Sequence, residues 1–293
     1  MKILGIESSC DETAAAIVED GVKIISHAVA TSLDIQSQYG GVVPEVAARK
    51  QVEFIIPVLK ETFAKAEMTK DDIDAIAVTV GPGLMGSLLV GVETAKVLSC
   101  LWKKPLIPVN HLVGHIYSGW LDDSAENKPA FPLIALIASG GHTDLVLMKG
   151  HGQLEKIGQT CDDAVGEAFD KVAKMLDLGY PGGPIVERMA VGGDPEAFDF
   201  PRPMISSSDL DFSYSGLKTA VLYKVRDLKA DGKLDEQAIT DICASFQEAA
   251  FDVLVTKTMH AAQQHNVKSI LVTGGVAASR SLKKRFEDAV ATL

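Results

Sequence analysis

Short apolar runs separated by polar turns open the chain, which is the pattern of β-strands joined by tight turns. We expect strands at residues 3–6 and 13–18, separated by the polar turn ESSCDE at residues 7–12. A third strand is predicted near residues 22–32, after the Asp20-Gly21 turn. The chain therefore begins as an antiparallel meander.

A helix is predicted next, over about residues 45–66, with a kink at Pro57. Its apolar residues recur four, three and four positions apart, at Val52, Ile56, Leu59 and Phe63.

Residues 76–80 then alternate as a strand that runs into the glycine-rich turn GPG at residues 81–83. A second helix is marked by apolar residues from Leu84 to Leu98. Residues 106–109 form a short apolar run that we expect to be a strand, with the helix of the next residues directly after it. A polar stretch at residues 122–128 is typical of a connection between domains.

The opening pattern recurs in the second half of the chain. Residues 133–138 and 144–148 are predicted strands on either side of a turn, SGGHT, and a third strand and a helix follow at residues 154–159 and 162–176. We therefore predict a duplicated α/β architecture of mixed sheets flanked by helices, with domains at residues 1–125 and 126–293 and a cleft between them.

The end of the chain has a strand, paired glycines and a helix. The strand is predicted at residues 269–273, and Gly274 and Gly275 precede a basic helix over about residues 279–289. This order allows the backbone to approach a bound nucleotide closely.

Charge and cysteine content narrow the possible roles. The net charge is −11, from 28 basic and 39 acidic residues, which is unfavourable for gripping nucleic acid without a partner. The four cysteines are widely spaced, and no apolar run approaches the ~20 residues that cross a bilayer. We expect a reduced, cytoplasmic protein without a membrane partner.

Two histidines, His111 and His115, follow the short apolar run and are four positions apart. On a helix, residues with this spacing lie on one face, so the two imidazoles can close on one metal ion. Zinc proteases place a glutamate after the first histidine as general base, whereas Leu112 occupies that position here. Taken alone, such a pair favours two structural helix histidines over a metal site.

The turns that follow the first strand of each half consist of glycine, serine and polar residues. This composition places backbone N–H groups around phosphates, but tight β-turns use the same residues for geometry alone. Two such turns in equivalent places, with a third glycine-rich turn near the end, form the pattern of the actin/hexokinase/Hsp70-like ATPase superfold.

Eight motifs, in order from the first residues to the last, resemble those of the TsaD family of tRNA adenosine threonylcarbamoyltransferases, which were formerly described as O-sialoglycoprotein endopeptidases. The motifs are residues 7–13 (ESSCDET), 81–84 (GPGL), 111–115 (HLVGH), 139–143 (SGGHT), 166–171 (GEAFDK), 180–184 (YPGGP), 212–218 (FSYSGLK) and 274–278 (GGVAA). The resemblance implies the two-domain actin-like ATPase (ASKHA) fold with a central nucleotide cleft.

The resemblance also implies a reaction and its participants. The threonylcarbamoyl group of threonylcarbamoyl-AMP is transferred to the N6 amine of the adenosine 3′ of the anticodon, in tRNAs that read ANN codons. Bacterial members of the family act with a paralogous scaffold subunit (TsaB-like) and a small ATPase subunit (TsaE-like). We expect the same partners here.

Site residues follow from the resemblance position by position. It implies that His111 and His115 bind one divalent metal ion, iron or zinc, and that the run Ile137, Ala138, Ser139, Gly140 and Gly141 holds the activated group through backbone donors. The nucleoside is expected against Asp170, Gly183, Glu187 and Ser279. Asp11 and Glu12 are our candidates for organising the reacting centre, and the alternative for both is a role in capping the turn.

Two departures from the family pattern concern this site. Ser279 stands where the family usually has asparagine, so it keeps a hydroxyl and lacks the amide. The family also continues past the position of Leu293 with a segment that carries an aspartate as third metal ligand. We therefore expect that this chain is a shortened form and that its third ligand lies beyond Leu293.

Three other functions remain as alternatives. The histidine pair suggests a metalloendopeptidase, although neither histidine has a neighbouring glutamate. A non-catalytic scaffold paralogue would lack the histidine pair, which this chain keeps. A sugar kinase would share the superfold, but the histidine pair and the FSYSG motif at residues 212–216 argue against it.

Overall fold

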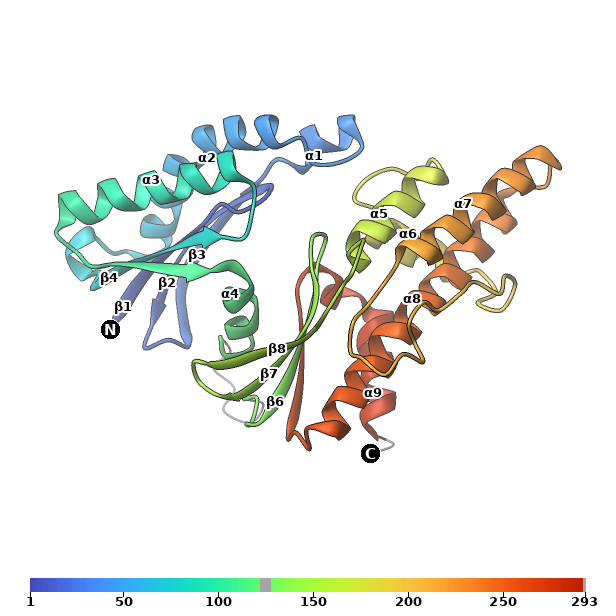
Figure 1. Ribbon diagram of the computed structural model, residues 1–293. Helices are drawn as coiled ribbons and strands as arrows, with labels where there is room; N and C mark the ends of the chain where they lie inside the picture. The colour runs from blue at the N-terminus through green and yellow to red at the C-terminus, as the bar shows by residue number, and fades with distance from the viewer. Residues whose placement is uncertain (122–127, 292–293) are drawn as a thin grey trace. The chain divides into compact units, whose positions relative to one another are not determined.

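The computed structural model describes residues 1–121 and 128–291 of the chain (Figure 1). The chain divides into two compact units, Met1–Lys128 and Pro129–Leu293. The predicted domain boundary between residues 125 and 126, and residues 122–127 of the predicted connection, lie outside the described residues.

The first unit is a mixed sheet with the strand order β3-β2-β1-β4-β5. β1 pairs antiparallel with β2 and parallel with β4, and β4 pairs parallel with β5. Helices α2 and α3 lie side by side along the sheet, and α4 follows the end of β5 (Figure 1). The elements are β1 (Lys2–Glu7), β2 (Glu12–Glu19), β3 (Lys23–Thr31), α1 (Leu33–Gln36), α2 (Pro44–Ala66), β4 (Ala75–Gly81), α3 (Met85–Trp102), β5 (Leu106–Asn110) and α4 (His111–Tyr117).

The second unit has a sheet with the strand order β8-β7-β6-β9, in which β6 pairs antiparallel with β7 and parallel with β9. Its helices pack on one another beside this sheet (Figure 1). The elements are β6 (Leu133–Ala138), β7 (Thr143–Gly150), β8 (Gln153–Gln159), α5 (Val165–Met175), α6 (Gly182–Ala190), α7 (Ser215–Ala230), α8 (Glu236–Gln264), β9 (Ser269–Thr273) and α9 (Arg280–Ala291).

The two sheets repeat one arrangement. The order β8-β7-β6-β9 matches β3-β2-β1-β4 strand for strand, with the same antiparallel and parallel pairings. This repetition confirms the predicted duplicated mixed α/β architecture. In both units the first strand is central, so the turn that follows it lies beside the carboxyl end of a parallel neighbour, where open α/β sheets bind ligands.

Helix α2 forms where it was predicted, but its buried face differs from the apolar stripe in the sequence. Val52 and Ile56 are 63% and 50% exposed, whereas the polar Gln51 is fully buried. Gln51 and Thr62 turn inward because they hydrogen-bond to neighbouring strands and to the first turn. The periodicity therefore identified the helix and not the face that it buries.

Three helices of the second unit were not predicted: α6, α7 and α8. The 29 residues of α8 include buried residues on every side, so its sequence lacks the polar face that marks a surface helix. The predicted helix at residues 162–176 begins three residues later, at Val165, because Asp162 and Asp163 form a hydrogen-bonded turn.

Helix α3 has the length and apolar composition of a membrane-spanning helix, although no apolar run of that length was expected. Among the described residues it is the one helix that is long and apolar enough to cross a membrane, by length and composition only, with 18 residues and a mean hydropathy of 1.3. It packs on β4 and α2, and one of its faces leaves Met85, Leu89 and Leu101 exposed.

We predict opposite effects for alanine at two neighbouring glycines of α6. A Cβ atom at Gly182 would lie 2.6 Å from Asp170 Cα and from the Phe169 carbonyl oxygen, whereas nothing lies within 4 Å of one at Gly183. Gly182→Ala should lower the free energy of unfolding by about 1–3 kcal/mol through overpacking. Gly183→Ala, the matched control, should leave it unchanged or raise it by up to ~1 kcal/mol. Urea denaturation measures both, and equal effects would contradict the packing.

Candidate active site

The turn between β1 and β2 is held by side chains from distant parts of the first unit. Gln51, on α2, donates from its side-chain amide to the carbonyl oxygens of Ser8, Cys10 and Glu12, at 3.3, 2.8 and 3.2 Å. The Ser32 hydroxyl donates to the Asp11 carbonyl oxygen at 2.9 Å. These bonds satisfy backbone groups that the turn leaves without strand partners, so the turn has one defined conformation.

The histidine pair lies on α4, directly after β5, as predicted. Asn110 ends the strand and caps the helix, because its Oδ1 accepts from the backbone N–H groups of Leu112 and Val113 at 2.9 and 3.3 Å. His111 and His115 therefore occupy consecutive turns of one helix face. Their Nε2 atoms lie 3.1 Å apart.

Glu7, the last residue of β1, lies next to Nδ1 of His111. Its Oε2 accepts from the Thr79 hydroxyl at 2.5 Å and lies 3.4 Å from His111 Nδ1, and its Oε1 accepts from the Ser9 N–H at 2.5 Å. Burial alone would raise the pKa of Glu7, but hydrogen bonds from His111, Ser9 and Thr79 outweigh it and lower the pKa to about 2. Glu7 is thus a fixed carboxylate at the carboxyl end of β1.

The two imidazoles fit a shared metal ion. Two nitrogen ligands at tetrahedral angles, about 2.0–2.1 Å from one zinc ion, are about 3.3–3.4 Å apart. The observed 3.1 Å between the Nε2 atoms is close to that separation. Among residues 1–121 and 128–291, no set of three histidine, cysteine, aspartate or glutamate side chains is arranged to hold a metal. The described chain therefore offers two ligands.

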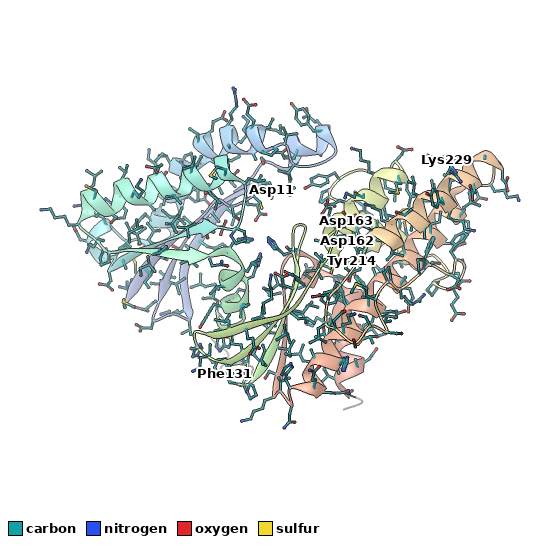
Figure 2. All side chains as sticks on the ribbon, in the orientation of Figure 1. Asp11, Phe131, Asp162, Asp163, Tyr214 and Lys229 are labelled. Atoms are coloured by element: carbon teal, nitrogen blue, oxygen red, sulfur yellow. The ribbon has the colours of Figure 1, made fainter. Side chains whose placement is uncertain are left out.

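Asp11 lies in the turn that follows β1 (Figure 2), and Glu12, the next residue, begins β2. Desolvation by the surrounding turn raises the pKa of Glu12, and the negative charges of Asp11 and Glu7 raise it further. Backbone carbonyls of both residues are bound by Ser32 and Gln51, while in the described part of the chain no hydrogen bond or ion pair involves either carboxylate. Both carboxylates are thus available to a ligand.

The corresponding turn of the second unit follows β6. Ile137 and Ala138 are fully buried; Ile137 pairs with both neighbouring strands and Ala138 with β7. The accessible part of the predicted run is therefore Ser139, Gly140 and Gly141. The Ser139 hydroxyl accepts from the His142 N–H at 3.1 Å, and the backbone carbonyl of Ser139 accepts from the Gly166 N–H at 3.2 Å. Space is open at both Gly140 and Gly141. This turn can present backbone N–H groups to an anion.

The predicted nucleoside residues of the second unit are linked by the packing of its helices. Asp170, on α5, accepts from the first N–H of α6, that of Gly182, at 2.7 Å. Glu187, on α6, accepts from the Ser279 hydroxyl and the Ser281 N–H at 2.9 and 3.0 Å. The first contact joins α5 to the start of α6, and the other two join α6 to the start of α9. Space is open at Gly183, the second residue of α6. Each carboxylate thus also supports the backbone.

A cluster that sequence reasoning missed joins two of the motifs. Asp162 accepts from the Ser213 hydroxyl at 2.6 Å and from the N–H groups of Tyr214 and Ser215 at 2.8 and 3.2 Å. Asp163 accepts from Lys171 and Lys218 at 2.7 and 2.5 Å. Asp162, Asp163 and Tyr214 are labelled in Figure 2. Two consecutive aspartates after a predicted strand were the signal that the sequence offered for this cluster. The two lysines that bind Asp163 lie 8 and 55 positions from it, so the sequence did not reveal them as its partners.

Charges set the ionisation of this cluster. Burial alone would raise the pKa of Asp163, but the hydrogen bonds from Lys171 and Lys218 outweigh it and lower the pKa. Hydrogen bonds to Asp163 and Glu167 raise the pKa of Lys171. The cluster is therefore an ion network that ties α5 and α7 to the end of β8.

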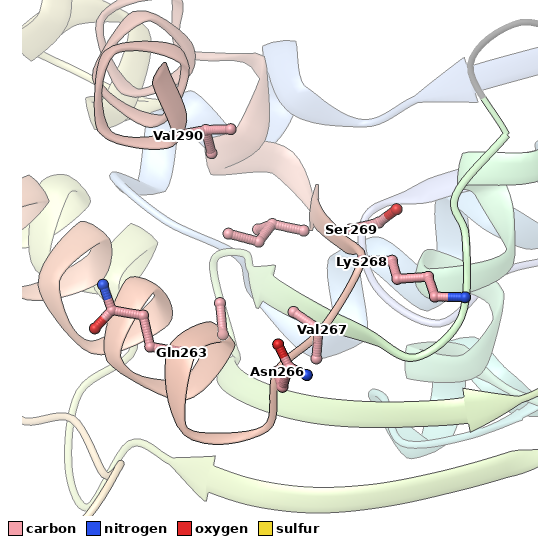
Figure 3. Close-up of a pocket in the computed structure, with 8 residues that line it drawn as sticks. Gln263, Asn266, Val267, Lys268, Ser269 and Val290 are labelled. Carbon is pink, nitrogen blue, oxygen red and sulfur yellow. The ribbon is translucent and has the colours of Figure 1, made fainter. Parts of the chain in front are cut away.

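A hollow of about 300 Å³ lies elsewhere in the second unit, between the end of α8, the start of β9 and the end of α9 (Figure 3). Gln263, Asn266, Lys268 and Val290 are among the residues that line it. None of the predicted site residues borders this hollow. The hollow is thus separate from the predicted site residues.

Comparison with solved structures places the fold in a class. The HypF structure of T. kodakarensis aligns with a TM-score of 0.59 at 14% identity, covering 99% of this chain and 44% of that one. The (R)-2-hydroxyglutaryl-CoA dehydratase component A of Acidaminococcus fermentans aligns with a TM-score of 0.54 at 15% identity, covering 99% and 89%. These likenesses and the duplicated strand order define a mixed α/β fold of the actin-like ATPase type.

Sequence comparison identifies the family within this class. The TsaD family, tRNA N6-adenosine threonylcarbamoyltransferase, matches residues 23–293. Proteins with that same name are 52% identical in Symbiobacterium thermophilum and 53% identical in Dehalococcoides mccartyi. Each alignment covers 98% of this chain, and 82% and 85% of the relative, respectively. The chain belongs to the TsaD family of tRNA N6-adenosine threonylcarbamoyltransferases.

This membership confirms the predicted family, fold class and transferase activity. The metalloendopeptidase, scaffold and sugar-kinase alternatives lose their support, because the named relatives at this level of identity are transferases. The family name also identifies tRNA as the class of substrate.

We predict that Asp163→Asn destabilises the protein in a pH-dependent way. Asp163 is 13% exposed and bonded to two lysines, so the loss should be on the order of 1–3 kcal/mol at pH 7. Because the folded pKa lies below the ordinary value of 3.8, this stabilisation is complete above pH 3.8. It should disappear as the pH falls below that value.

Urea denaturation of wild type and variant between pH 7 and pH 3 measures this difference. Asp231→Asn is the control, because Asp231 is 61% exposed in its ion pair with Lys233 and should contribute little. A difference between wild type and Asp163→Asn that does not shrink in acid would contradict the ion network.

Proposed function

We propose that this chain transfers the threonylcarbamoyl group of threonylcarbamoyl-AMP to the N6 amine of the adenosine 3′ of the anticodon, in tRNAs that read ANN codons. The products are AMP and threonylcarbamoyladenosine. The observation that carries the proposal is the 52–53% identity to transferases of that name over 98% of the chain. The polar turns at the strand ends of both units agree with it.

The reaction is acyl transfer from a mixed anhydride to a weak nucleophile. The N6 nitrogen forms a bond to the carbamoyl carbon, the bond from that carbon to the AMP phosphate oxygen breaks, and the amine loses a proton. AMP is already a good leaving group, so positioning and stabilisation of developing charge should dominate catalysis. We propose that Asp11 and Glu12 organise this centre, since both carboxylates are available in a turn that Gln51 holds.

One divalent metal ion, iron or zinc, is the proposed cofactor. His111 and His115 would hold it through their Nε2 atoms, whose 3.1 Å separation suits one ion. When bound, the ion would supply a Lewis acid and a template for phosphate and carbamoyl oxygens. Glu7, Ser9 and Thr79 form the polar environment behind His111.

The second unit supplies the proposed contacts to the nucleotide. Ser139, Gly140 and Gly141 would present backbone N–H groups to the activated group at the end of β6, as part of the predicted run that begins at Ile137. Asp170, Glu187 and Ser279 would bind ribose hydroxyls, and Gly183 gives clearance for a base. Ser279 supports this role through its hydroxyl, which donates to Glu187.

Protein partners are proposed on the grounds of charge and surface. A net charge of −11 is unfavourable for holding tRNA alone. Apolar side chains stand exposed on α2 and α3, and such patches mark protein interfaces. We propose that they dock a paralogous scaffold subunit (TsaB-like), and that a small ATPase subunit (TsaE-like) completes a cytoplasmic assembly. The exposed residues are Val52, Ile56, Met85, Leu89, Val97 and Leu101.

The first experiment is a transfer assay with the partner proteins, labelled threonylcarbamoyl-AMP and unmodified tRNA. His111→Ala and His115→Ala should each abolish transfer and lower bound metal, because each removes one of the two described ligands. His27→Ala is the control, since His27 is exposed on β3 and distant in sequence from the pair. Full transfer by either helix variant would disprove the metal role, and no transfer by wild type would disprove the reaction.

Asp11→Asn separates catalysis from metal binding. If Asp11 acts on the reacting amine, the variant should lower kcat by about 100-fold, in the range typical of acid–base groups. Bound metal should stay at the wild-type level, because Asp11 makes no contact with the histidine pair among the described residues. An unchanged kcat would assign Asp11 to the alternative role of shaping the turn.

A further inference from the structure

The two ring nitrogens of His111 face different surroundings. Nδ1 lies 3.1 Å from Ser9 Oγ and 3.4 Å from Glu7 Oε2, whereas Nε2 faces His115. We propose that Glu7 is a positioning residue that holds the proton of His111 on Nδ1, and so leaves the Nε2 lone pair for a metal ion. This inference rests on the metal site proposed above.

The position of the proton follows from what each neighbour can do. A carboxylate can only accept hydrogen bonds, so an Nδ1 without a proton would direct its lone pair at the negative charge of Glu7. The Ser9 hydroxyl can both donate and accept, so it adapts to a ring that carries the proton on Nδ1. The neutral ring then has its acceptor at Nε2. In the hydrogen bond between the two Nε2 atoms, which lie 3.1 Å apart, His115 is then the donor and His111 the acceptor.

The carboxylate is held in place by the sheet. Glu7 pairs with Ala14 at the end of β1, and its two oxygens accept from the Ser9 N–H and the Thr79 hydroxyl, both at 2.5 Å. Thr79 lies on β4, the parallel neighbour of β1, and is 6% exposed. His111 itself follows β5, the next strand of the sheet. The carboxylate, the hydroxyls and the ring are therefore positioned by adjacent strand ends, which limits rotation of the imidazole.

Such a carboxylate affects a metal site in two ways. It fixes the tautomer and orientation of the ring, and it makes the ligating nitrogen more basic. Loss of this kind of partner lowers metal affinity by about 10- to 100-fold. A Glu7 that only stabilised the turn would alter the unfolding midpoint and would change neither the tautomer nor the affinity of the folded protein.

The test is Glu7→Gln, which keeps the shape of the side chain and replaces one acceptor oxygen by an NH₂ donor. Histidine ¹⁵N chemical shifts in the metal-free protein report which nitrogen of His111 carries the proton. We expect Nδ1–H in wild type and a shift towards Nε2–H in the variant. Zinc affinity, measured by competition with a chromogenic chelator, should fall by about 10- to 100-fold.

Glu93→Gln is the matched control, because it removes the same charge from the first unit at an exposed site where Glu93 pairs with Lys96. Its zinc affinity should stay within about twofold of wild type. The proposal is overturned by an Nε2–H tautomer in wild type, or by a folded Glu7→Gln protein that keeps wild-type affinity. If Glu7→Gln does not fold, the wild-type tautomer still decides the case.

The outcomes also separate this inference from the proposed metal site. If His115→Ala binds zinc as tightly as wild type, the metal site is wrong. The tautomer of His111 in wild type and in Glu7→Gln would then still show whether Glu7 sets the proton. If His115→Ala loses zinc and Glu7→Gln does not, the site stands and the role of Glu7 is wrong.

Discussion

The first unit depends on the hydrogen bonds that tie its buried first turn to distant elements. The turn after β1 has little regular pairing of its own, and Ser8 and Ser9 within it are buried. Its carbonyl groups are bound by Gln51 from α2 and by Ser32 after β3, and Glu7 is bound by Thr79 from β4. Each partner comes from a different element, so the turn has its conformation only when the whole sheet and its helices are assembled.

The second unit uses carboxylates in the same way. The first N–H groups of a helix lack intrahelical acceptors, and negative charge is favourable there. Asp162 binds N–H groups at the start of α7, Asp170 binds that of Gly182 at the start of α6, and Glu187 binds that of Ser281 at the start of α9. These tertiary caps orient three helices around the strand ends. The same side chains thus position the backbone and lie where a nucleotide is proposed to bind.

Both units therefore place polar, backbone-rich turns at the carboxyl ends of their parallel strand pairs. In the first unit the histidine pair lies at this position. In the second unit it is taken by Gly140 and Gly141 of the β6 turn, which border open space. Such an arrangement suits a reaction in which binding and charge stabilisation matter more than a strong base. It agrees with membership of the TsaD family, whose name describes the transfer of a threonylcarbamoyl group to N6 of a tRNA adenosine.

The sequence by itself determined the features that depend on neighbouring residues. Strand alternation, the glycine-rich turns, the long α2 helix and the i, i+4 pair of His111 and His115 are local, and the ordered motifs identified the family. Tertiary structure alone decided which face α2 buries and which groups surround His111. Glu7 and His111 are 104 positions apart, and Lys218 and Asp163 are 55 apart. Periodicity carries no information on such pairs, because they form only when separate elements of the fold meet and their buried polar groups require partners.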